Sequence, residues 1–451
     1  YEDLEDFQAE YVDRYFEENI YPVLTPMAVD ASRPFPLIRN KTLNIVALLE
    51  ANPKKDDLLG KAEEKKLKAE GKKGGTIYEY ATVQVPSVLP RLISIPSVKE
   101  GEKSFILLEQ IIEKNISKLF LGHKVVCAYP YRIMRNADLS FDEDEAEDLL
   151  KEIEKSLKKR QWGEVIRLEV EYGIDKRLLA FLKDELRVES EDDIFKINGP
   201  IDLTYLMKMY GLEGCDDLRY KPYTPQPVPQ IQQGESIFDA IKKGDILLHH
   251  PYQTFDPVVE FIRQAAKDPD VLAIKQTLYR VSGNSPIIAS LAQAAENGKQ
   301  VSVLVELKAR FDEENNIIWA KKLEKAGCHV IYGLVGLKTH SKIALVVRRE
   351  EEGICRYVHL GTGNYNDSTA KLYTDCGIFT CSEAIGEDAT AVFNMLSGYS
   401  EPLSWNRLVV APIWLRKRFL KLIERETKYA KTGKTAKIVA KMNSLCDRDI
   451  I

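Results

Sequence analysis

Apolar and polar residues follow a regular pattern between residues 271 and 364. Runs with the strand pattern alternate along the chain with runs that have the helical pattern. The strand-like runs are "VLAIKQTLYRV" (271–281), "QVSVLVELKARF" (300–311), "HVIYGLVG" (329–336), "HSKIALVVRR" (340–349) and "ICRYVHLGTGN" (354–364), and the helical runs are "SPIIASLAQAAENGK" (285–299) and "NNIIWAKKLEKAGC" (315–328). Strands that alternate with helices over short joints favour βαβ units. The pattern therefore predicts an α/β domain with a mostly parallel mixed sheet.

The first half of the chain is more mixed. Apolar or alternating runs such as 42–49 and 78–89 predict strands. Four prolines in "YKPYTPQPVPQ" disfavour regular structure and favour a stiff, extended connector at 216–235. The sequence thus predicts an α+β domain at 1–215, a Pro-rich linker and the α/β domain at 236–405.

Composition limits the class of protein. With 451 residues, 44% of them apolar, the chain can bury more than one core. The formal net charge is -5, whereas a nucleic-acid binder typically has an excess of positive charge, so no nucleic-acid partner is expected. The seven cysteines are odd in number and scattered, which indicates reduced thiols and a cytoplasmic protein. No apolar run reaches about 18 residues, so no membrane span is predicted.

Basic side chains gather where the predicted strands end or begin. Arg280 ends the first strand, Lys308 and Arg310 end the second, and His340 and Lys342 begin a later one. Ligands of open α/β sheets bind beyond the carboxyl ends of the strands, so these groups are expected at one edge of the sheet. Arginine holds phosphate oxygens with a planar fork, and lysine adds a compact positive charge. The combination predicts a phosphate site.

His340 and Lys342 are separated by one residue, so a strand would point both side chains to one face. A neutral imidazole nitrogen is a competent nucleophile near pH 7 and forms a phosphoramidate. A lone histidine is more often structural, and Arg280 or Arg310 alone would more often form a surface salt bridge with an acid such as Asp312. The four basic groups together favour the catalytic interpretation.

A glycine-rich turn, "GTGN" (361–364), follows the last predicted strand. Small residues such as Gly361 let backbone amides approach an anion, so Gly361, Thr362 and Asn364 are candidate phosphate-binding residues. Taken alone, this sequence predicts no more than a turn. His249 and His250 are expected to cap or pack a loop rather than bind a metal, and His359 is expected to be a buried strand residue that could also orient the site.

The H-x-K motif followed by a G-T-G-N turn resembles the phospholipase D superfamily, although Val347 stands where that pattern has an aspartate. The fuller match is to the bacterial-type polyphosphate kinases of the first family, which the chain resembles over essentially its whole length. The segments that carry this resemblance include "YPVLTPMAVDASRPFP", "HHPYQTFDPVVEFIRQAA", "ELKARFDEENNI", "KTHSKIALVVRRE", "HLGTGNYN" and "KLYTDCGIFT". It implies a head domain at 1–215, a first phospholipase D-like catalytic domain at 236–405 and the opening of a truncated second catalytic domain at 406–451.

The resemblance also implies roles for single residues. His340 falls on the autophosphorylated histidine of the family and Tyr373 on a tyrosine that contacts the nucleotide. Arg280 and Arg310 fall on the family's magnesium site, and since a guanidinium has no lone pair for a cation, both are expected to hold the phosphates that carry Mg²⁺. ATP and polyphosphate are the implied substrates and Mg²⁺ the implied cofactor. A homo-oligomer is also implied, cytoplasmic and either soluble or peripherally attached to the membrane.

The resemblance therefore implies a polyphosphate kinase that transfers the γ-phosphate of ATP reversibly to inorganic polyphosphate through a phosphohistidine. One alternative is a phospholipase D-like phosphodiesterase or nuclease, against which Val347 weighs. Another is a non-catalytic, phosphate-binding fragment, because both ends of the chain look cut.

Overall fold

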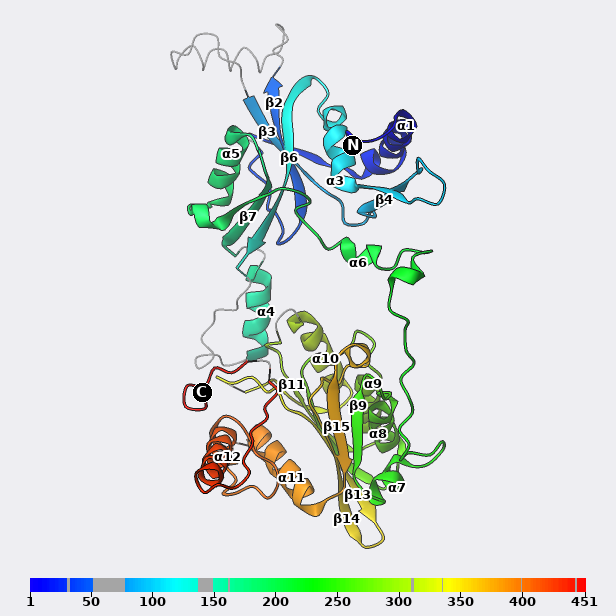
Figure 1. The fold of residues 1–451 in the computed structure, drawn as a ribbon, viewed down its shortest axis with the longest axis vertical. Helices are drawn as coiled ribbons and strands as arrows, with labels where there is room; N and C mark the ends of the chain where they lie inside the picture. The colour runs from blue at the N-terminus through cyan, green and yellow to red at the C-terminus, as the bar shows by residue number, and fades with distance from the viewer. Residues whose placement is uncertain are drawn as a thin grey trace. The chain divides into compact units, whose positions relative to one another are not determined.

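The computed structural model describes residues 1–30, 33–51, 78–136, 149–160, 163–309, 312–334, 336–398, 400–442 and 444–451. The chain forms two compact units (Figure 1). The N-terminal unit comprises Tyr1–Ser140 and Lys155–Lys221, and the C-terminal unit comprises Phe141–Glu154 and Pro222–Ile451. Within the described ranges, no helix combines the length and the apolar character that crossing a bilayer requires.

The N-terminal unit is built on a six-stranded sheet with the order β1-β3-β2-β6-β7-β8. Its ladders are antiparallel except that between β7 and β8. The strands are β1 (Pro26–Val29), β2 (Leu43–Ala51), β3 (Tyr78–Gln84), β6 (His123–Arg135), β7 (Val165–Glu171) and β8 (Ile194–Ile197), with β4 (Leu92–Ile95) and β5 (Ser104–Leu107) forming a separate hairpin. The helices up to residue 221 are α1 (Asp6–Tyr15), α3 (Leu108–Lys114), α4 (Leu149–Arg160), α5 (Lys176–Leu186) and α6 (Leu206–Met209), with short helical turns η1 (Phe16–Ile20), η2 (Tyr21–Val23), η3 (Ile116–Leu119), η4 (Glu191–Asp193) and η5 (Asp216–Leu218).

Strand β2 is apolar on both faces and separates two cores. Leu43, Ile45 and Ala47 point into one buried cluster, and Val46 and Leu48 point into another. Successive side chains of a strand lie on opposite faces, so a nearly continuous apolar run requires cover on both sides.

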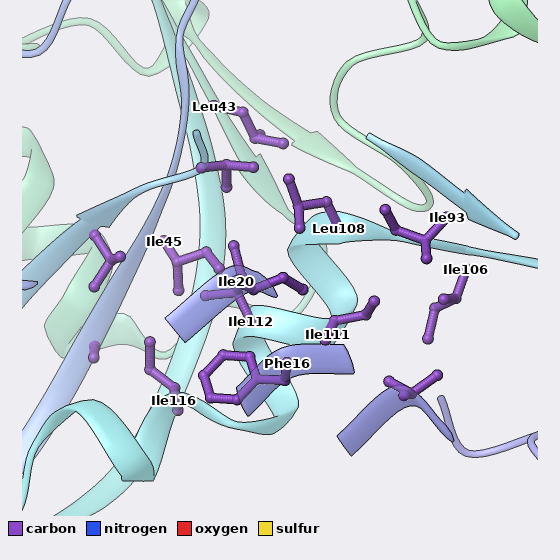
Figure 2. Close-up of a cluster of buried hydrophobic side chains, with 14 of the residues drawn as sticks. Phe16, Ile20, Leu43, Ile45, Ile93, Ile106, Leu108, Ile111, Ile112 and Ile116 are labelled. Carbon is purple, nitrogen blue, oxygen red and sulfur yellow. The ribbon is translucent and has the colours of Figure 1, made fainter. Parts of the chain in front are cut away.

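Helices provide that cover. Phe16 of η1 and Ile111 of α3 fill the first cluster (Figure 2). Leu178, Leu182 and Leu186 of α5, spaced four residues apart on one helical face, fill the second. The N-terminal unit is therefore a sheet between helical layers, and the predicted mixture of helices and strands is confirmed.

The C-terminal unit is built on a seven-stranded mixed sheet with the order β12-β11-β10-β13-β14-β15-β9. Its strands are β9 (Ile246–His250), β10 (Val271–Leu278), β11 (Gln300–Val305), β12 (His329–Ile331), β13 (Lys342–Glu350), β14 (Gly353–Gly361) and β15 (Asp375–Thr380). Its helices are α7 (Ile237–Lys242), α8 (Asp256–Lys267), α9 (Pro286–Glu296), α10 (Glu313–Lys325), α11 (Glu383–Gly398) and α12 (Ile413–Lys431), with a short turn η6 (Thr369–Lys371).

The prediction of a mixed sheet is confirmed, but the prediction that it is mostly parallel is wrong for its ladders. Only β10 with β11 and β11 with β12 are parallel, whereas the other four ladders are antiparallel. Strands β13 and β14 are joined by a two-residue connection between Glu350 and Gly353, which only an antiparallel pair can use. The described residues between β12 and β13 form no helix either, so they provide no crossover of the kind that a parallel pair needs.

Helices cover both faces of this second sheet. Helices α7 to α10 pack in a row, while α11 contacts β13 and β14. On β14, Tyr357 packs against Phe238 of α7, with ring centroids 4.9 Å apart, whereas the next residue, Val358, lies in the cluster with Phe393 of α11. Strand β14 is therefore covered on both faces, and polar chemistry is left to the edges at which the strands end.

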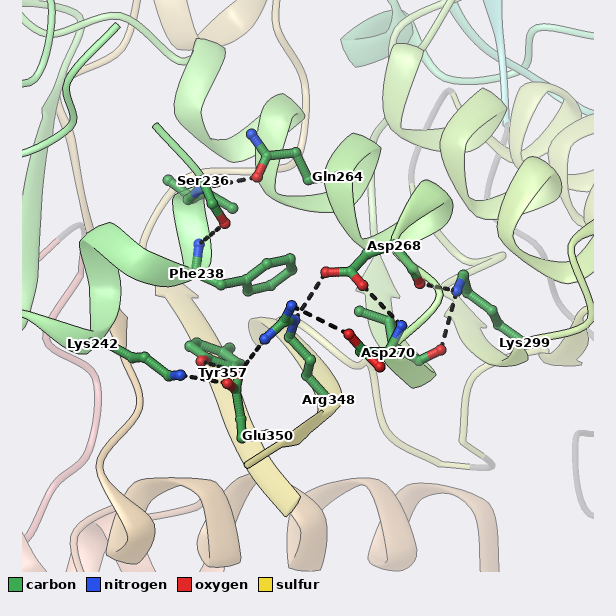
Figure 3. A network of polar contacts seen from close by, with 12 residues as sticks. Ser236, Phe238, Lys242, Gln264, Asp268, Asp270, Lys299, Arg348, Glu350 and Tyr357 are labelled. Carbon is green, nitrogen blue, oxygen red and sulfur yellow. Dashed lines mark hydrogen bonds and ion pairs between the residues drawn. The ribbon is translucent and has the colours of Figure 1, made fainter. Parts of the chain in front are cut away.

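Arg348 lies in a polar network near the end of β13 (Figure 3). Its guanidinium contacts Asp268 at 2.9 Å and Glu350 at 2.6 Å. The Tyr357 hydroxyl donates a hydrogen bond to Glu350 at 2.6 Å, and Lys242 pairs with the same carboxylate. Burial raises the pKa of Glu350, but hydrogen bonds from Lys242, Tyr357 and Arg348 outweigh it and lower the pKa to about 2.

Arg348→Met is expected to lower the free energy of unfolding by about 3 kcal/mol at pH 7, because it leaves two largely buried carboxylates without their shared cation. The lowered pKa of Glu350 means that this contribution is present above the ordinary glutamate pKa and is lost as the pH falls towards about 2. Urea unfolding would measure both effects. Arg263→Met removes an exposed pair with Glu260 and is the matched control, with an expected cost below about 1 kcal/mol. Equal costs for the two variants would contradict the prediction.

Candidate active site

The candidate site lies at the edge of the C-terminal unit's sheet where β10, β11 and β14 end and β13 begins. The register pairs Leu278 at the end of β10 with Val305 at the end of β11. It also pairs Lys342, which begins β13, with Gly361, which ends β14. Since β13 pairs with β10 as well, residues that flank these positions along the chain meet at one edge.

Three basic side chains surround the ring of Tyr279, the residue that follows β10. The His340 ring meets it edge-on, with centroids 4.9 Å apart. Lys342 Nζ lies 5.1 Å and Arg280 Cζ 5.5 Å from the Tyr279 centroid, within the range at which an aromatic ring attracts a cation. Tyr279 was not among the residues predicted from the sequence, although its position at a strand end directly before Arg280 was an available signal.

Lys342 is buried, with 5% of its surface exposed, and its Nζ donates a hydrogen bond to the carbonyl oxygen of His340 at 2.5 Å. Burial lowers the pKa of Lys342 to about 8, with a further lowering by Arg280 and an opposing effect of Asp375. The ammonium group is therefore mostly charged at pH 7 and loses its proton in mildly alkaline solution.

His340 lies just before β13 and is exposed. Partial burial, Lys342 and Arg280 lower the pKa of its imidazole below the ordinary value. At neutral pH the ring is thus uncharged, and an uncharged ring has a nitrogen lone pair available for attack on an electrophile.

The other predicted basic residues have different surroundings. Arg280 forms an ion pair with Asp312 at 2.8 Å, the partner that the salt-bridge interpretation named. Lys308 Nζ donates to the carbonyl oxygens of Leu334 at 3.3 Å and Leu337 at 3.1 Å, so it ties down the loop that leads to the histidine. Arg310 lies outside the described residues. The predicted phosphate contacts of these side chains stay predictions.

The turn at 361–364 packs closely against Asp375 at the start of β15. The Thr362 hydroxyl donates to Asp375 Oδ1 at 2.9 Å, and the Thr362 amide donates to the carbonyl oxygen of Cys376 at 2.9 Å. A Cβ added to Gly363 would lie 2.5 Å from Asp375 Oδ2, so a side chain there would force a shift. Asn364 Oδ1 is buried and has no hydrogen-bond partner among the described residues. The role of the turn in phosphate binding stays a prediction.

Two histidines lie near this turn. His359 is buried on β14, its Nδ1 lies 2.9 Å from the Tyr365 hydroxyl, and burial, with His250 nearby, lowers its pKa to about 3. His250 ends β9, and its Nδ1 lies 3.0 Å from the carbonyl oxygen of Gln253. A Cβ on Gly377 would lie 2.8 Å from His359 Nε2, so the ring depends on the absence of a side chain there. His250 packs a loop and His359 is a buried strand residue, in agreement with the sequence analysis.

Tyr373 and Val347 are two further positions that the sequence analysis named. Tyr373 lies between η6 and β15 and is 64% exposed, which leaves its ring accessible to a ligand. Val347 packs against the apolar cluster beneath α11, so an apolar side chain occupies the position of the phospholipase D aspartate.

A protein-held Mg²⁺ site does not fit the described residues. Within the described ranges, no three or more histidine, cysteine, aspartate or glutamate side chains gather in a way that could hold a metal ion. Arg280 has no lone pair to donate, and the carboxylate of Asp312 is already engaged by it.

Comparison with known proteins gives consistent matches along the chain. Three family models match, described as the polyphosphate kinase middle domain at residues 7–209, the polyphosphate kinase C-terminal domain 1 at 236–402 and the polyphosphate kinase C-terminal domain 2 at 408–451. A polyphosphate kinase of Halalkalibacterium halodurans is 52% identical over all of this chain and 61% of its own length. One from Exiguobacterium sibiricum is 53% identical over all of this chain and 60% of its own length.

A solved structure agrees with these matches. The crystal structure of polyphosphate kinase from Porphyromonas gingivalis is 29% identical, with a TM-score of 0.76 over 99% of this chain and 62% of that one. The chain thus spans about three fifths of the length of the relatives that it matches.

Proposed function

The chain belongs to the polyphosphate kinase family, and from this premise we propose that it carries the histidine of an ATP:polyphosphate phosphotransferase. In this proposal the γ-phosphoryl group of ATP passes reversibly to inorganic polyphosphate through a phosphohistidine at His340. The observation that supports it best is the grouping of His340, Lys342 and Arg280 around Tyr279 at the ends of the strands.

In the first step, an uncharged imidazole nitrogen of His340 attacks the γ-phosphorus. The bond to the β,γ-bridging oxygen breaks, ADP leaves, and a phosphoramidate forms. Phosphoryl transfer depends mainly on positioning and on stabilisation of negative charge. Lys342 and Arg280 supply positive charge within reach of the histidine ring, and Tyr373 and Arg310 are proposed to hold the nucleotide and its phosphates.

In the second step, a terminal oxygen of polyphosphate attacks the phosphohistidine, which frees the imidazole and lengthens the chain by one phosphate. The reverse sequence makes ATP from ADP. Mg²⁺ enters the proposal only as the counter-ion of the ATP phosphates, and it is these phosphates that Arg280 and Arg310 would bind. Lys308, Gly361, Thr362 and Asn364 are proposed to complete the phosphate contacts.

The proposal assigns 1–215 to a head domain, 216–235 to a linker, 236–405 to the first phospholipase D-like catalytic domain and 406–451 to the beginning of the second. A homo-oligomeric, cytoplasmic state, soluble or peripherally attached to the membrane, belongs to the same proposal.

Incubation with γ-labelled ATP and Mg²⁺ tests the first step. We expect a label on the protein that is acid-labile and stable in base, as a phosphoramidate is, and that passes to added polyphosphate. ATP labelled at the α-phosphate is the control and should leave the protein unlabelled. Bound ATP without any phosphoprotein would contradict the proposal and favour a non-catalytic, phosphate-binding role.

A further inference from the structure

Buried side chains hold the two chain neighbours of His340, Thr339 and Ser341. On one side, the backbone N–H of Thr339 donates to Glu306 Oε2 at 2.7 Å. On the other side, the Thr277 hydroxyl donates to the carbonyl oxygen of Ser341 at 2.7 Å. His340 thus lies between two hydrogen-bonded neighbours, one held from strand β10 and the other from the residue that follows β11.

Thr277 lies on β10 and is 2% exposed. Its hydroxyl also accepts a hydrogen bond from the backbone N–H of Ile343 at 3.1 Å, so a single oxygen fixes the chain on both sides of Lys342. A hydroxyl can donate once and accept twice, and valine, which has the same shape, can do neither.

Glu306 directly follows β11 and is fully buried. Its second carboxylate oxygen accepts from the backbone N–H of Lys308 at 3.0 Å, so both oxygens bind backbone rather than solvent. Buried carboxylates are costly unless they are hydrogen-bonded in this way. A Cβ added to Gly333 would lie 3.4 Å from the same carboxylate, which shows how closely the loop before the histidine approaches it.

The backbone of Glu306 is itself held by hydrogen bonds. The Asn316 side-chain amide of α10 donates to the carbonyl oxygens of Glu306 and Tyr279, both at 2.8 Å. The backbone N–H of Glu306 donates to the carbonyl oxygen of Leu278 at 2.9 Å. The ends of β10 and β11, the ring of Tyr279 and the histidine segment therefore belong to one hydrogen-bonded frame.

We propose that Thr277 and Glu306 are positioning residues that hold the segment 339–341, so that the His340 ring is presented to the incoming phosphoryl group. The inference rests on the proposed function and adds two residues to it. Neither side chain needs to touch the substrate, because each acts through the backbone on one side of the histidine. A displacement of the nucleophile by about 1 Å can cost about 100-fold in rate, so such a frame has a measurable effect.

Four variants of the full chain test the proposal. Thr277→Val removes the hydroxyl at constant shape, Thr277→Ser restores it, and Glu306→Gln places an amide NH₂ where one oxygen accepted a hydrogen bond. Thr380→Val is the matched control, because Thr380 is also fully buried in this sheet and its hydroxyl accepts from the backbone N–H of Ser382 at 3.0 Å.

We expect Thr277→Val to lower the rate of His340 labelling by γ-labelled ATP about 10- to 100-fold, with the dissociation constant for ATP within about 2-fold of the wild type. Glu306→Gln should also lower the rate, and Thr277→Ser should restore most of it. Thr380→Val should label at the wild-type rate even though its urea midpoint falls by a similar amount. Equal rates for Thr277→Val and Thr380→Val would overturn the proposal.

A second readout does not depend on kinase activity. Nuclear magnetic resonance of ¹⁵N-histidine-labelled protein resolves the rings of only six histidines, and His340→Ala assigns the relevant one. In the wild type and in Thr380→Val, the His340 pKa should lie below its ordinary value, and in Thr277→Val and Glu306→Gln it should move back towards that value. An unlabelled wild type would count against the proposed function alone, whereas an unmoved His340 pKa in both variants would count against the positioning roles.

Discussion

Replacement of His340 by alanine is expected to abolish the phosphoenzyme. Removal of an attacking nucleophile typically costs about 10⁴-fold or more in rate, because the neighbouring groups position and stabilise a reaction that they cannot begin. Lys342 and Arg280 remain in the variant, so ATP should still bind. Labelling by γ-labelled ATP, with the modified peptide identified by mass spectrometry, measures the first effect, and equilibrium dialysis with ATP measures the second.

His329→Ala is the matched control for this experiment. His329 is also exposed and begins β12, at the edge of the sheet opposite to the candidate site. Its loss should leave the labelling unchanged. Label of equal intensity in the wild type and in His340→Ala would show that another residue is the nucleophile, and loss of ATP binding together with the label would show that His340 is needed for binding.

Lys342→Met is expected to lower the rate of labelling by about 100-fold or more, because it removes a preorganised positive charge at the reacting phosphoryl group. The pKa of about 8 gives the prediction a pH signature. Lysine carries its charge below that pH and loses it as the pH rises, so the wild-type rate should fall on the alkaline side with a midpoint near 8. Lys342→Met should lack this alkaline fall. Lys267→Gln, at an exposed position of α8, should behave as the wild type.

Lys342→Met should increase the stability of the folded protein although it lowers the rate of labelling. Because the folded state lowers the pKa of Lys342, the unfolded chain binds the proton more readily, and the free energy of unfolding should rise as the pH rises from about 8 towards the ordinary lysine value. At pH 7 the buried ammonium costs stability, so Lys342→Met should unfold at a higher urea concentration than the wild type while it reacts more slowly. A variant that is both less stable and slower would indicate that Lys342 acts mainly in packing.

The pKa of His340 determines how the labelling rate changes with pH in acidic solution. The pKa of His340 is lowered by partial burial, Lys342 and Arg280, so its neutral form persists below the pH at which an ordinary histidine becomes charged. The rate should therefore stay constant from neutral pH down to below about 6.5, the ordinary histidine value, and then fall as the ring becomes protonated. In Lys342→Met this acid fall should shift to higher pH, because one of the charges that lowers the histidine pKa is gone.

The sequence by itself determined the strands β10 to β14 and the helices α9 and α10 of the C-terminal unit, and it singled out candidate site residues at their ends. The alternation of strand-like and helical runs is a local property, and so is the position of Arg280, His340 and Lys342 at the boundaries of those runs. A polar residue at either end of an apolar strand must lie at an edge of the sheet, whichever neighbours the strand acquires. For this reason these three residues could be singled out without a structure.

The order of the strands and the surroundings of the histidine were decided only by the tertiary structure. The two-residue hairpin makes β13 and β14 antiparallel, and this pairing is what brings Lys342 beside Gly361. Thr277 contacts Ser341 across 64 positions of sequence, and Glu306 contacts Thr339 across 33. A threonine inside an apolar strand and a glutamate at the end of one carry no distinctive sequence signal. Burial and partners gave them their significance, as burial gave Lys342 its lowered pKa, and these depend on which distant segments pack together rather than on the residues next to them.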